Sequence, residues 1–194
     1  MLASVDEAVA QWFADHRIGV LDDITIWLAG VSELLGVLAA VGVIWVCVAV
    51  WFGGWRPMLQ VVVVLAAVSL LTSWMKPVID RPRPSGDLAL TFIGGSAMPS
   101  SQALITSSIV VAVVMADWWV SDSRRRAAAI YGAVGCLVVG AAMVYMGAHW
   151  LTDVLVGWAI GVGLTWPLMR VAQAMSPAAR SGRFSAPPRR PPRE

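Results

Sequence analysis

The stretch "HWLTDVLVGWAIGVGLTWPLMR", residues 149–170, decides the fold class of this chain. It begins with two ionisable residues, His149 and Asp153, and then continues from 154 to 169 without a charged side chain. A helix that crosses the hydrocarbon core of a bilayer needs about 20 predominantly apolar residues. The stretch therefore predicts a membrane-crossing helix over roughly 153–171, with polar side chains at its start.

The rest of the sequence repeats this apolar pattern. The chain is 58% hydrophobic and 13% charged, with a mean hydropathy of +0.73, which excludes an ordinary soluble globular domain. Four more stretches suit membrane spans: roughly 27–52, 57–75, 98–118 and 127–147. We therefore expect an all-α integral membrane helical bundle with about five transmembrane helices. The glycines of "GWAIGVGL" (157–164) would let neighbouring helices approach closely.

The two ends of the chain differ from this bundle. Residues 1–23 mix acids and bases and lack the pattern of a secretory signal, so we expect no cleavage. Val5, Val9, Trp12 and Phe13 recur at helical spacing, which predicts an amphipathic helix at the membrane surface. A loosely ordered terminus is the alternative. We expect a transmembrane domain over 24–172 and a disordered, basic, Pro- and Arg-rich tail over 173–194.

The distribution of arginines predicts the orientation. With five crossings, Arg56, Arg124 and its two neighbours, and the Arg-rich tail fall on one side. The positive-inside rule makes this side, including the C-terminus, cytoplasmic. The loop 76–97 and the loop around His149 then face the extracytoplasmic side of a bacterial-type plasma membrane.

Three polar segments meet on that outer side: "KPVIDRPRP" (76–84), "PSSQ" (99–102) and "HWLTD" (149–153). Lys76 and Arg83 lie on a proline-stiffened loop, where an ammonium and a planar guanidinium suit a phosphate. Contact with lipid headgroups is the alternative. Ser100 begins a span, where free backbone N–H groups attract anions, although a plain N-cap explains it equally well.

His149 and Asp153 are spaced i, i+4, so on one helix face the carboxylate can hold one imidazole nitrogen. The other nitrogen is then free to act as a nucleophile on phosphorus. The three segments together predict a phosphate site, which a purely structural scaffold would leave unexplained.

In this order the segments resemble the type 2 phosphatidic acid phosphatase (PAP2) superfamily, whose members are membrane lipid-phosphate phosphatases related to vanadium haloperoxidases. The family motifs are K-x6-RP, PSGH and SR-x5-H-x3-D. The matching residues are Lys76, Arg83, Pro84, Pro99, Ser100, His149 and Asp153. The departures are Ser101 for glycine, Gln102 for histidine, Ala142 for serine and Met143 for arginine.

The resemblance implies roles for the residues that match. Lys76, Arg83, Ser100 and Ser101 would bind the phosphoryl group, His149 would attack it to form a phosphohistidine, and Asp153 would orient His149. Gln102 replaces the general acid, and an amide has no proton to give near neutral pH. Met143 removes a bidentate cation, for which Arg81 is a candidate replacement.

Two hypotheses follow. The first is a lipid phosphate or prenyl diphosphate phosphohydrolase, weakened or restricted in substrate, which favours diphosphates because their leaving group needs an acid less. The second is a catalytically inactive membrane protein for lipid-phosphate binding, transport or accessory function. Both take membrane lipids as partners and no nucleic acid, cofactor or metal; the oligomeric state is not indicated.

Four further residues carry weaker expectations. Glu33 lies inside the first span, where it either faces the site or reaches back to the interface. Cys47 and Cys136 fall in apolar runs and indicate neither a metal site nor a disulfide. His16 is expected to be solvated.

Overall fold

The computed structural model describes residues 2–33, 55–116, 119 and 121–175, and within them it contains helices and no strands. The helices are α1 (Leu2–Asp15), α2 (Gly19–Glu33), α4 (Trp55–Ile79), α5 (Ser101–Met115), α6 (Asp122–Tyr145) and α7 (Leu151–Ala174). The predicted all-α class is confirmed. Most of the predicted span 27–52 and nearly all of the predicted tail, from 176 onward, lie outside the described residues.

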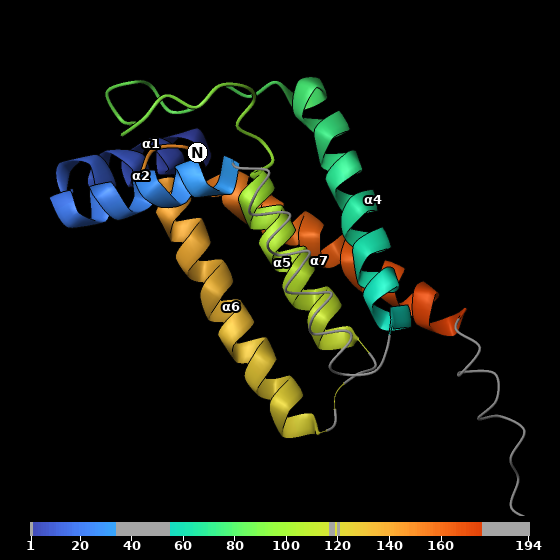
Figure 1. Cartoon of the computed structure of the whole chain (residues 1–194). Coiled ribbons are helices and arrows are strands. Elements are labelled where there is room, and N and C mark those ends of the chain that lie inside the picture. Colours follow the sequence, from blue (N-terminus) through green and yellow to red (C-terminus); the bar gives the residue numbers. More distant parts are fainter. Residues whose placement is uncertain (1, 34–54, 117–118, 120, 176–194) are drawn as a thin grey trace, which may run out of the picture.

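The helices form a bundle that is covered at one end (Figure 1). Helix α5 packs most extensively against α7 and then α6, and α4 packs against both α5 and α7. Helices α1 and α2 lie across one end of the bundle, at the same end as the long loop between α4 and α5 (Figure 1). There α1 contacts α6 and α7. The three polar segments therefore share one end of the molecule with α1.

The close packing of α5 on α7 depends on two glycines. A Cβ added to Gly157 would lie 2.7 Å from the backbone oxygen of Ser100, and one added to Gly161 would lie 2.5 Å from the backbone oxygen of Leu104. Real side chains cannot approach to such distances, so both positions need glycine. The predicted close approach at "GWAIGVGL" is confirmed at these two residues, whereas Gly163 faces open space.

Helix ends place the polar segments where the bundle ends. Helix α4 includes Lys76 and Pro77, so the expectation that Lys76 lies on the proline-stiffened loop is wrong. The helix continues to Ile79 because Pro77 is tolerated near its end, and the loop begins at Asp80, which has a positive φ of 43°. Ser100 is the N-cap of α5, and its Oγ accepts a hydrogen bond from Ala103 N at 3.5 Å. Trp150 precedes α7, and its N–H donates to Asp153 Oδ2 at 2.9 Å.

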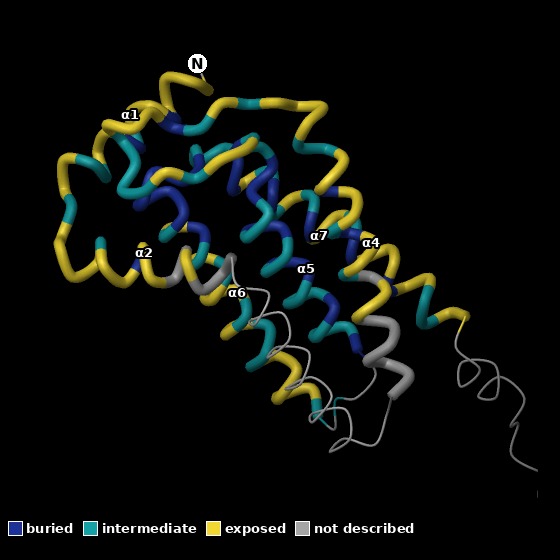
Figure 2. Tube along the Cα trace, turned by 45° about the horizontal axis from the view of Figure 1, so that its top comes forward, coloured by how far each residue is buried: buried dark blue, intermediate teal, exposed yellow. Residues whose placement is uncertain are grey.

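The exposed surface of the bundle is that of an integral membrane protein. Helices α6 and α7 are long and apolar enough to cross a bilayer, and Leu65–Ile79 and Ser101–Met115 are shorter apolar helices. Large apolar side chains are exposed along the bundle, among them Leu70, Val134, Leu137, Val162 and Trp166. The buried positions concentrate instead where α5 and α7 meet and toward the covered end (Figure 2). The count of five crossings stays a prediction.

The N-terminal segment forms two helices where the sequence predicted one over 1–23. The Tyr145 hydroxyl accepts a hydrogen bond from Ile18 N at 2.9 Å and donates to Asp22 Oδ1 at 2.6 Å. These contacts hold the chain at the break between α1 and α2 against the end of α6. A break that depends on a partner 127 residues away in sequence leaves no local signal.

The predicted apolar stripe of α1 is divided between two surfaces. Val5 and Trp12 are 45% and 56% exposed, whereas Asp6 and Ala10 are buried, and Val9 and Phe13 pack against the core of the bundle. The face that docks is therefore rotated from the predicted one and includes a carboxylate. Placement of α1 at the membrane interface stays a prediction.

Candidate active site

The two predicted phosphate-binding cations converge on one backbone carbonyl. Lys76 Nζ donates to the oxygen of Ser96 at 3.3 Å, and Arg83 Nη2 donates to the same oxygen at 3.5 Å. Arg83 also donates from Nε to Gly95 O at 3.0 Å and from Nη1 to Ala148 O at 2.5 Å. Backbone oxygens thus take up donors that a phosphate could use.

Two cavities adjoin these cations. Arg83 lines the larger one, about 540 Å³, together with the loop 89–95, Gly147 and Ala148. Lys76 and Ser101 line a smaller one of about 130 Å³ between α4 and α5. The larger volume lies within the range of small-molecule sites.

His149 lies beneath Arg83 with a defined hydrogen-bonding pattern. Its side chain is 1% exposed, and its Nδ1 is 2.8 Å from the carbonyl oxygen of Ala97. Because a carbonyl oxygen only accepts, Nδ1 carries the hydrogen. In the neutral ring Nε2 then has a lone pair, and it lies 3.2 Å from Arg83 Nη1. The nitrogen predicted to be the nucleophile is thus in contact with a predicted phosphate ligand.

Asp153 lies beside the imidazole but is not its closest acceptor. Its Oδ2 is 3.7 Å from His149 Nδ1, so the orienting hydrogen bond of the ring goes to Ala97 O. Asp153 itself is fully buried, and its Oδ1 accepts from Arg81 Nη1 at 2.6 Å. The sequence missed the Ala97 acceptor, because any residue type can supply a backbone oxygen.

The surroundings keep the imidazole neutral. Burial lowers the pKa of His149 below its ordinary value of 6.5, and the positive charges of Arg83 and Lys76 lower it further. The Asp153 carboxylate opposes this shift without reversing it. A neutral ring at pH 7 is the form that has a lone pair to attack with.

Arg81, the candidate extra phosphate cation, is bound to carboxylates instead. Its Nη1 donates to Asp153 Oδ1 and to Thr152 Oγ1, both at 2.6 Å, and its Nη2 donates to Asp6 Oδ2 at 2.7 Å. These contacts hold the guanidinium on the Asp153 side of the site. The geometry does not favour the phosphate-binding role that the sequence suggested for Arg81.

Asp6 is the functional candidate that sequence reasoning missed. It is 2% exposed, and its carboxylate also accepts from Thr152 N at 2.9 Å and from Thr152 Oγ1 at 2.5 Å. A signal was present, because Asp6 shares a helix face with Val9, Ala10 and Phe13 (i, i+3, i+4, i+7). A carboxylate within an apolar face indicates a buried partner.

The second motif contributes the start of α5. Ser100 is completely buried, and its N–H donates to the backbone oxygen of Asp153 at 3.1 Å. This bond, together with the N-cap, gives Ser100 a structural role at the junction of α5 and α7. Ser101 and Gln102 are half-buried in the first turn of α5, and Ser101 lines the smaller cavity.

Metal ligands do not cluster in this region. Within the part of the chain that the structure describes, no group of three or more His, Cys, Asp or Glu side chains could hold a metal ion.

Comparison with known proteins places the chain in a family. A sequence model of the PAP2 superfamily matches residues 57–176. The chain belongs to the PAP2 superfamily. The match contains all three polar segments and begins after α1. Asp6 therefore lies outside the part of this PAP2 protein that the family model covers. No curated protein sequence matches the chain significantly.

A solved structure has the same fold. It is described as the first transmembrane PAP2 type phosphatidylglycerolphosphate phosphatase from Bacillus subtilis. The TM-score is 0.76 over 90% of this chain and 88% of that chain, at 22% sequence identity. At this identity the similarity establishes a shared transmembrane PAP2 fold.

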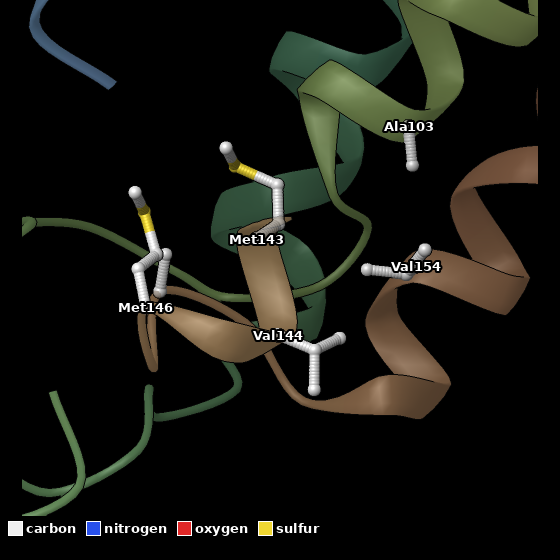
Figure 3. Packing of buried hydrophobic residues seen from close by; sticks show 6 residues of the cluster. Ala103, Met143, Val144, Met146 and Val154 are labelled. Carbon is white, nitrogen blue, oxygen red and sulfur yellow. The ribbon is translucent and has the colours of Figure 1, made fainter. Parts of the chain in front are cut away.

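Met143, which stands where the PAP2 motif has arginine, is part of the apolar core. It is 4% exposed and belongs to a cluster with Ala103, Val144, Met146, Ala148 and Val154 (Figure 3). The backbone oxygen of Met143 accepts from His149 N at 3.2 Å, so Met143 is in direct backbone contact with His149. In this PAP2 protein that position supports the His149 loop by packing.

Proposed function

We propose that this PAP2 protein hydrolyses a lipid phosphate or prenyl diphosphate through a phosphohistidine on His149, at the extracytoplasmic face of the membrane. Its activity is weakened or restricted in substrate by Gln102 and Met143. One observation carries the proposal: a buried imidazole donates from Nδ1 to Ala97 O and holds Nε2 at 3.2 Å from Arg83 Nη1. This arrangement places the lone pair of a nucleophile next to a cation that can bind the phosphate it attacks.

The proposed reaction has two steps. In the first, the Nε2 lone pair forms a bond to phosphorus, and the phosphorus–oxygen bond to the leaving group breaks, its electron pair staying on that oxygen. The ring becomes positively charged, and Ala97 O and the Asp153 carboxylate stabilise it. In the second step water attacks phosphorus, the N–P bond breaks, and inorganic phosphate and a neutral imidazole result.

Substrate binding requires an exchange of hydrogen-bond partners. The Arg83 donors contact Gly95 O, Ser96 O and Ala148 O, and the Lys76 ammonium shares Ser96 O. A phosphate oxygen carries charge and forms stronger hydrogen bonds to these cations than a neutral carbonyl does. Movement of Arg83 onto phosphate would also release Nε2. The 540 Å³ cavity that Arg83 lines offers space beside it for the substrate.

The leaving group decides which substrates suit this site. A lipid alcohol leaves as a strongly basic alkoxide and needs a proton, which Gln102 cannot supply. A prenyl diphosphate loses a weakly basic phosphate monoester and needs that proton much less. We therefore expect faster phosphate release from diphosphates; equal rates from a diphosphate and a phosphatidic acid would contradict this reasoning.

A second function is a lipid-phosphate binding, transport or accessory protein without turnover. The observation that favours it is the packing of Met143 in the apolar cluster, which leaves no cation at a position where the motif has one. This alternative keeps Lys76 and Arg83 as anion ligands and assigns no chemistry to His149.

Phosphate release separates the two functions. Purified full-length protein in detergent micelles is tested on a panel of lipid monophosphates and diphosphates, as the native chain and as His149→Gln. The matched control is His16→Gln, since His16 is the only other histidine in the sequence and is exposed in the short linker between α1 and α2. The enzyme proposal requires release that only His149→Gln abolishes. Saturable binding of a lipid phosphate without release would establish the alternative.

The proposed orientation has its own test. Single cysteines at Asp87 and Ser123, exposed positions in the α4–α5 loop and at the start of α6, are introduced after replacement of Cys47 and Cys136. A membrane-impermeant thiol reagent applied to intact cells should label position 87 and not position 123. The reverse pattern would contradict the extracytoplasmic placement of the site.

A further inference from the structure

A series of ionisable side chains connects α1 to the His149 site. The Arg81 guanidinium bridges Asp6 of α1 at 2.7 Å and Asp153 of α7 at 2.6 Å. The two carboxylates are 2% and 0% exposed, and the Arg81 side chain is 23% exposed. Asp153 in turn lies 3.7 Å from His149 Nδ1. Negative and positive groups therefore alternate along the series Asp6, Arg81, Asp153 and His149, because the His149 imidazole becomes positively charged in the proposed reaction.

Thr152 fixes the geometry of this series of ionisable side chains. Its N–H and hydroxyl both donate to Asp6, and its hydroxyl oxygen accepts from Arg81. Thr152 lies in the first turn of α7, directly before Asp153. Asp6 is therefore held against the same helical turn that presents Asp153 to His149.

Docking of α1 does not depend on Asp6 alone. Phe13 packs edge-on against Tyr145 with ring centroids 5.8 Å apart, and Arg17 donates to Leu88 O at 2.7 Å. Ile18 N also donates to the Tyr145 hydroxyl. Because these contacts attach the helix independently, a buried carboxylate at Asp6 is not needed merely to keep α1 in place.

The charges explain what Asp6 can do for the site. An arginine that pairs with Asp153 alone would neutralise most of its charge, and its stabilisation of a cationic imidazole would weaken. A second carboxylate on the same guanidinium leaves Asp153 with more of its negative character. Both carboxylates are buried, so solvent screens these interactions little.

We propose that Asp6 and Arg81 are positioning residues of the active site: Arg81 fixes Asp153 beside His149, and Asp6 sets how strongly Arg81 neutralises Asp153. Helix α1, which the family model does not cover, is then a functional part of the site. The proposal deepens the function proposed above and rests on His149 being the reactive group. It assigns Arg81 to the His149–Asp153 pair and not to the binding of phosphate.

The test measures the titration of His149 itself, so it does not require turnover. The charged groups that act on His149 come from four parts of the fold: Lys76 on α4, Arg83 on the α4–α5 loop, Asp153 on α7 and, through Asp153 and Arg81, Asp6 on α1. The sequence has two histidines, and His16, which is exposed and stacks on Trp12, serves as an internal reference. Histidine-labelled full-length protein in micelles is titrated by NMR.

The two variants should shift the His149 pKa in opposite directions. Asp6→Asn removes a negative charge and lets Arg81 neutralise Asp153, so the pKa should fall by roughly half a unit or more. Arg81→Gln removes a positive charge and leaves the negative charge of Asp153 unneutralised, so the His149 pKa should rise by roughly as much. Two control variants should leave the His149 pKa unchanged. They are Asp15→Asn, at an exposed position on α1, and Arg125→Gln, in an exposed ion pair on α6. Shifts in the same direction, or none, would overturn the proposal.

Conservative and double variants cover the case in which a single variant folds poorly. Asp6→Glu keeps the charge and should restore the native pKa of His149. The double variant Asp6→Asn/Arg81→Gln should have a higher unfolding midpoint than Arg81→Gln alone, since it leaves one buried carboxylate fewer without a cationic partner. A double variant less stable than both single variants contradicts the coupling.

Activity supplies a separate readout. Where the native chain releases phosphate, Arg81→Gln should lower kcat with little change in KM, because the guanidinium acts through Asp153. A raised KM with an unchanged kcat would instead assign Arg81 to phosphate. A native chain without release would count against the hydrolase function while the NMR titration still decides the roles of Asp6 and Arg81.

Discussion

Replacing Met143 with arginine, the residue that the PAP2 motif has at this position, should destabilise the protein. The Met143 side chain is 4% exposed and is surrounded by the apolar side chains of its cluster. A guanidinium placed there would lose its hydration without gaining a carboxylate partner within that cluster. The motif residue and the surroundings of this chain are therefore incompatible.

The expected loss is large. Leaving a charge buried and unpaired lowers the free energy of unfolding by about 3 to 5 kcal/mol. For a chain of this size each kcal/mol corresponds to about 2 to 4 °C in the unfolding midpoint, so the midpoint should fall by about 6 to 20 °C. Thermal unfolding of the purified protein in micelles, followed by tryptophan fluorescence, measures this shift.

The matched control is Met143→Leu, which conserves volume and apolar character. It should lower the free energy of unfolding by less than about 1.5 kcal/mol. The reasoning would be refuted if Met143→Arg unfolded within about 2 °C of the native chain, a shift of roughly 1 kcal/mol or less, and bound inorganic phosphate more tightly. That result would place position 143 in the anion site and not in the core.

Three further predictions follow from the site and its packing. Gln102→His restores a proton donor at a half-buried position and should raise release from a lipid monophosphate by about 10²-fold or more, with a smaller gain for a diphosphate; equal gains would count against the leaving-group argument. Gly161→Ala would bring a Cβ to 2.5 Å from the backbone oxygen of Leu104 and should lower the unfolding midpoint, whereas Gly163→Ala, which meets open space, should not. Burial holds the pKa of His149 below 6.5, so the imidazole stays neutral as the pH falls past 6.5. Phosphate release should therefore be lost only at a lower pH, at which the ring becomes protonated. A half-maximal rate at or above pH 6.5 would be inconsistent with this.

The helices and the end of the bundle that holds the site could be predicted from local sequence. A serine at the start of an apolar run predicted the beginning of α5, and the structure has Ser100 as its N-cap. The glycine-rich stretch 157–164 predicted a close helix contact, and Gly157 and Gly161 make one with α5. These features depend on residues near one another in sequence, so their chemistry can be recognised without the fold.

The partners of the site residues could not be predicted in the same way. Arg81 and Asp6 are 75 residues apart, and nothing local to Arg81 distinguishes a carboxylate partner from a phosphate. The acceptors of His149 and Lys76 are backbone oxygens of Ala97 and Ser96, which the loop conformation brings into place. Such contacts are set by tertiary structure, so only the cation, the imidazole and the carboxylate themselves could be identified from the sequence.

Trapping of a covalent intermediate tests the central claim most directly. The full-length protein is mixed with a prenyl diphosphate labelled on its terminal phosphate, quenched in base, in which phosphohistidine survives, and digested for mass spectrometry. The proposed mechanism predicts phosphate on the peptide that contains His149 and no label on His149→Gln. Phosphate release by the His149→Gln protein, or release by the native chain with no phosphohistidine on that peptide, would contradict it.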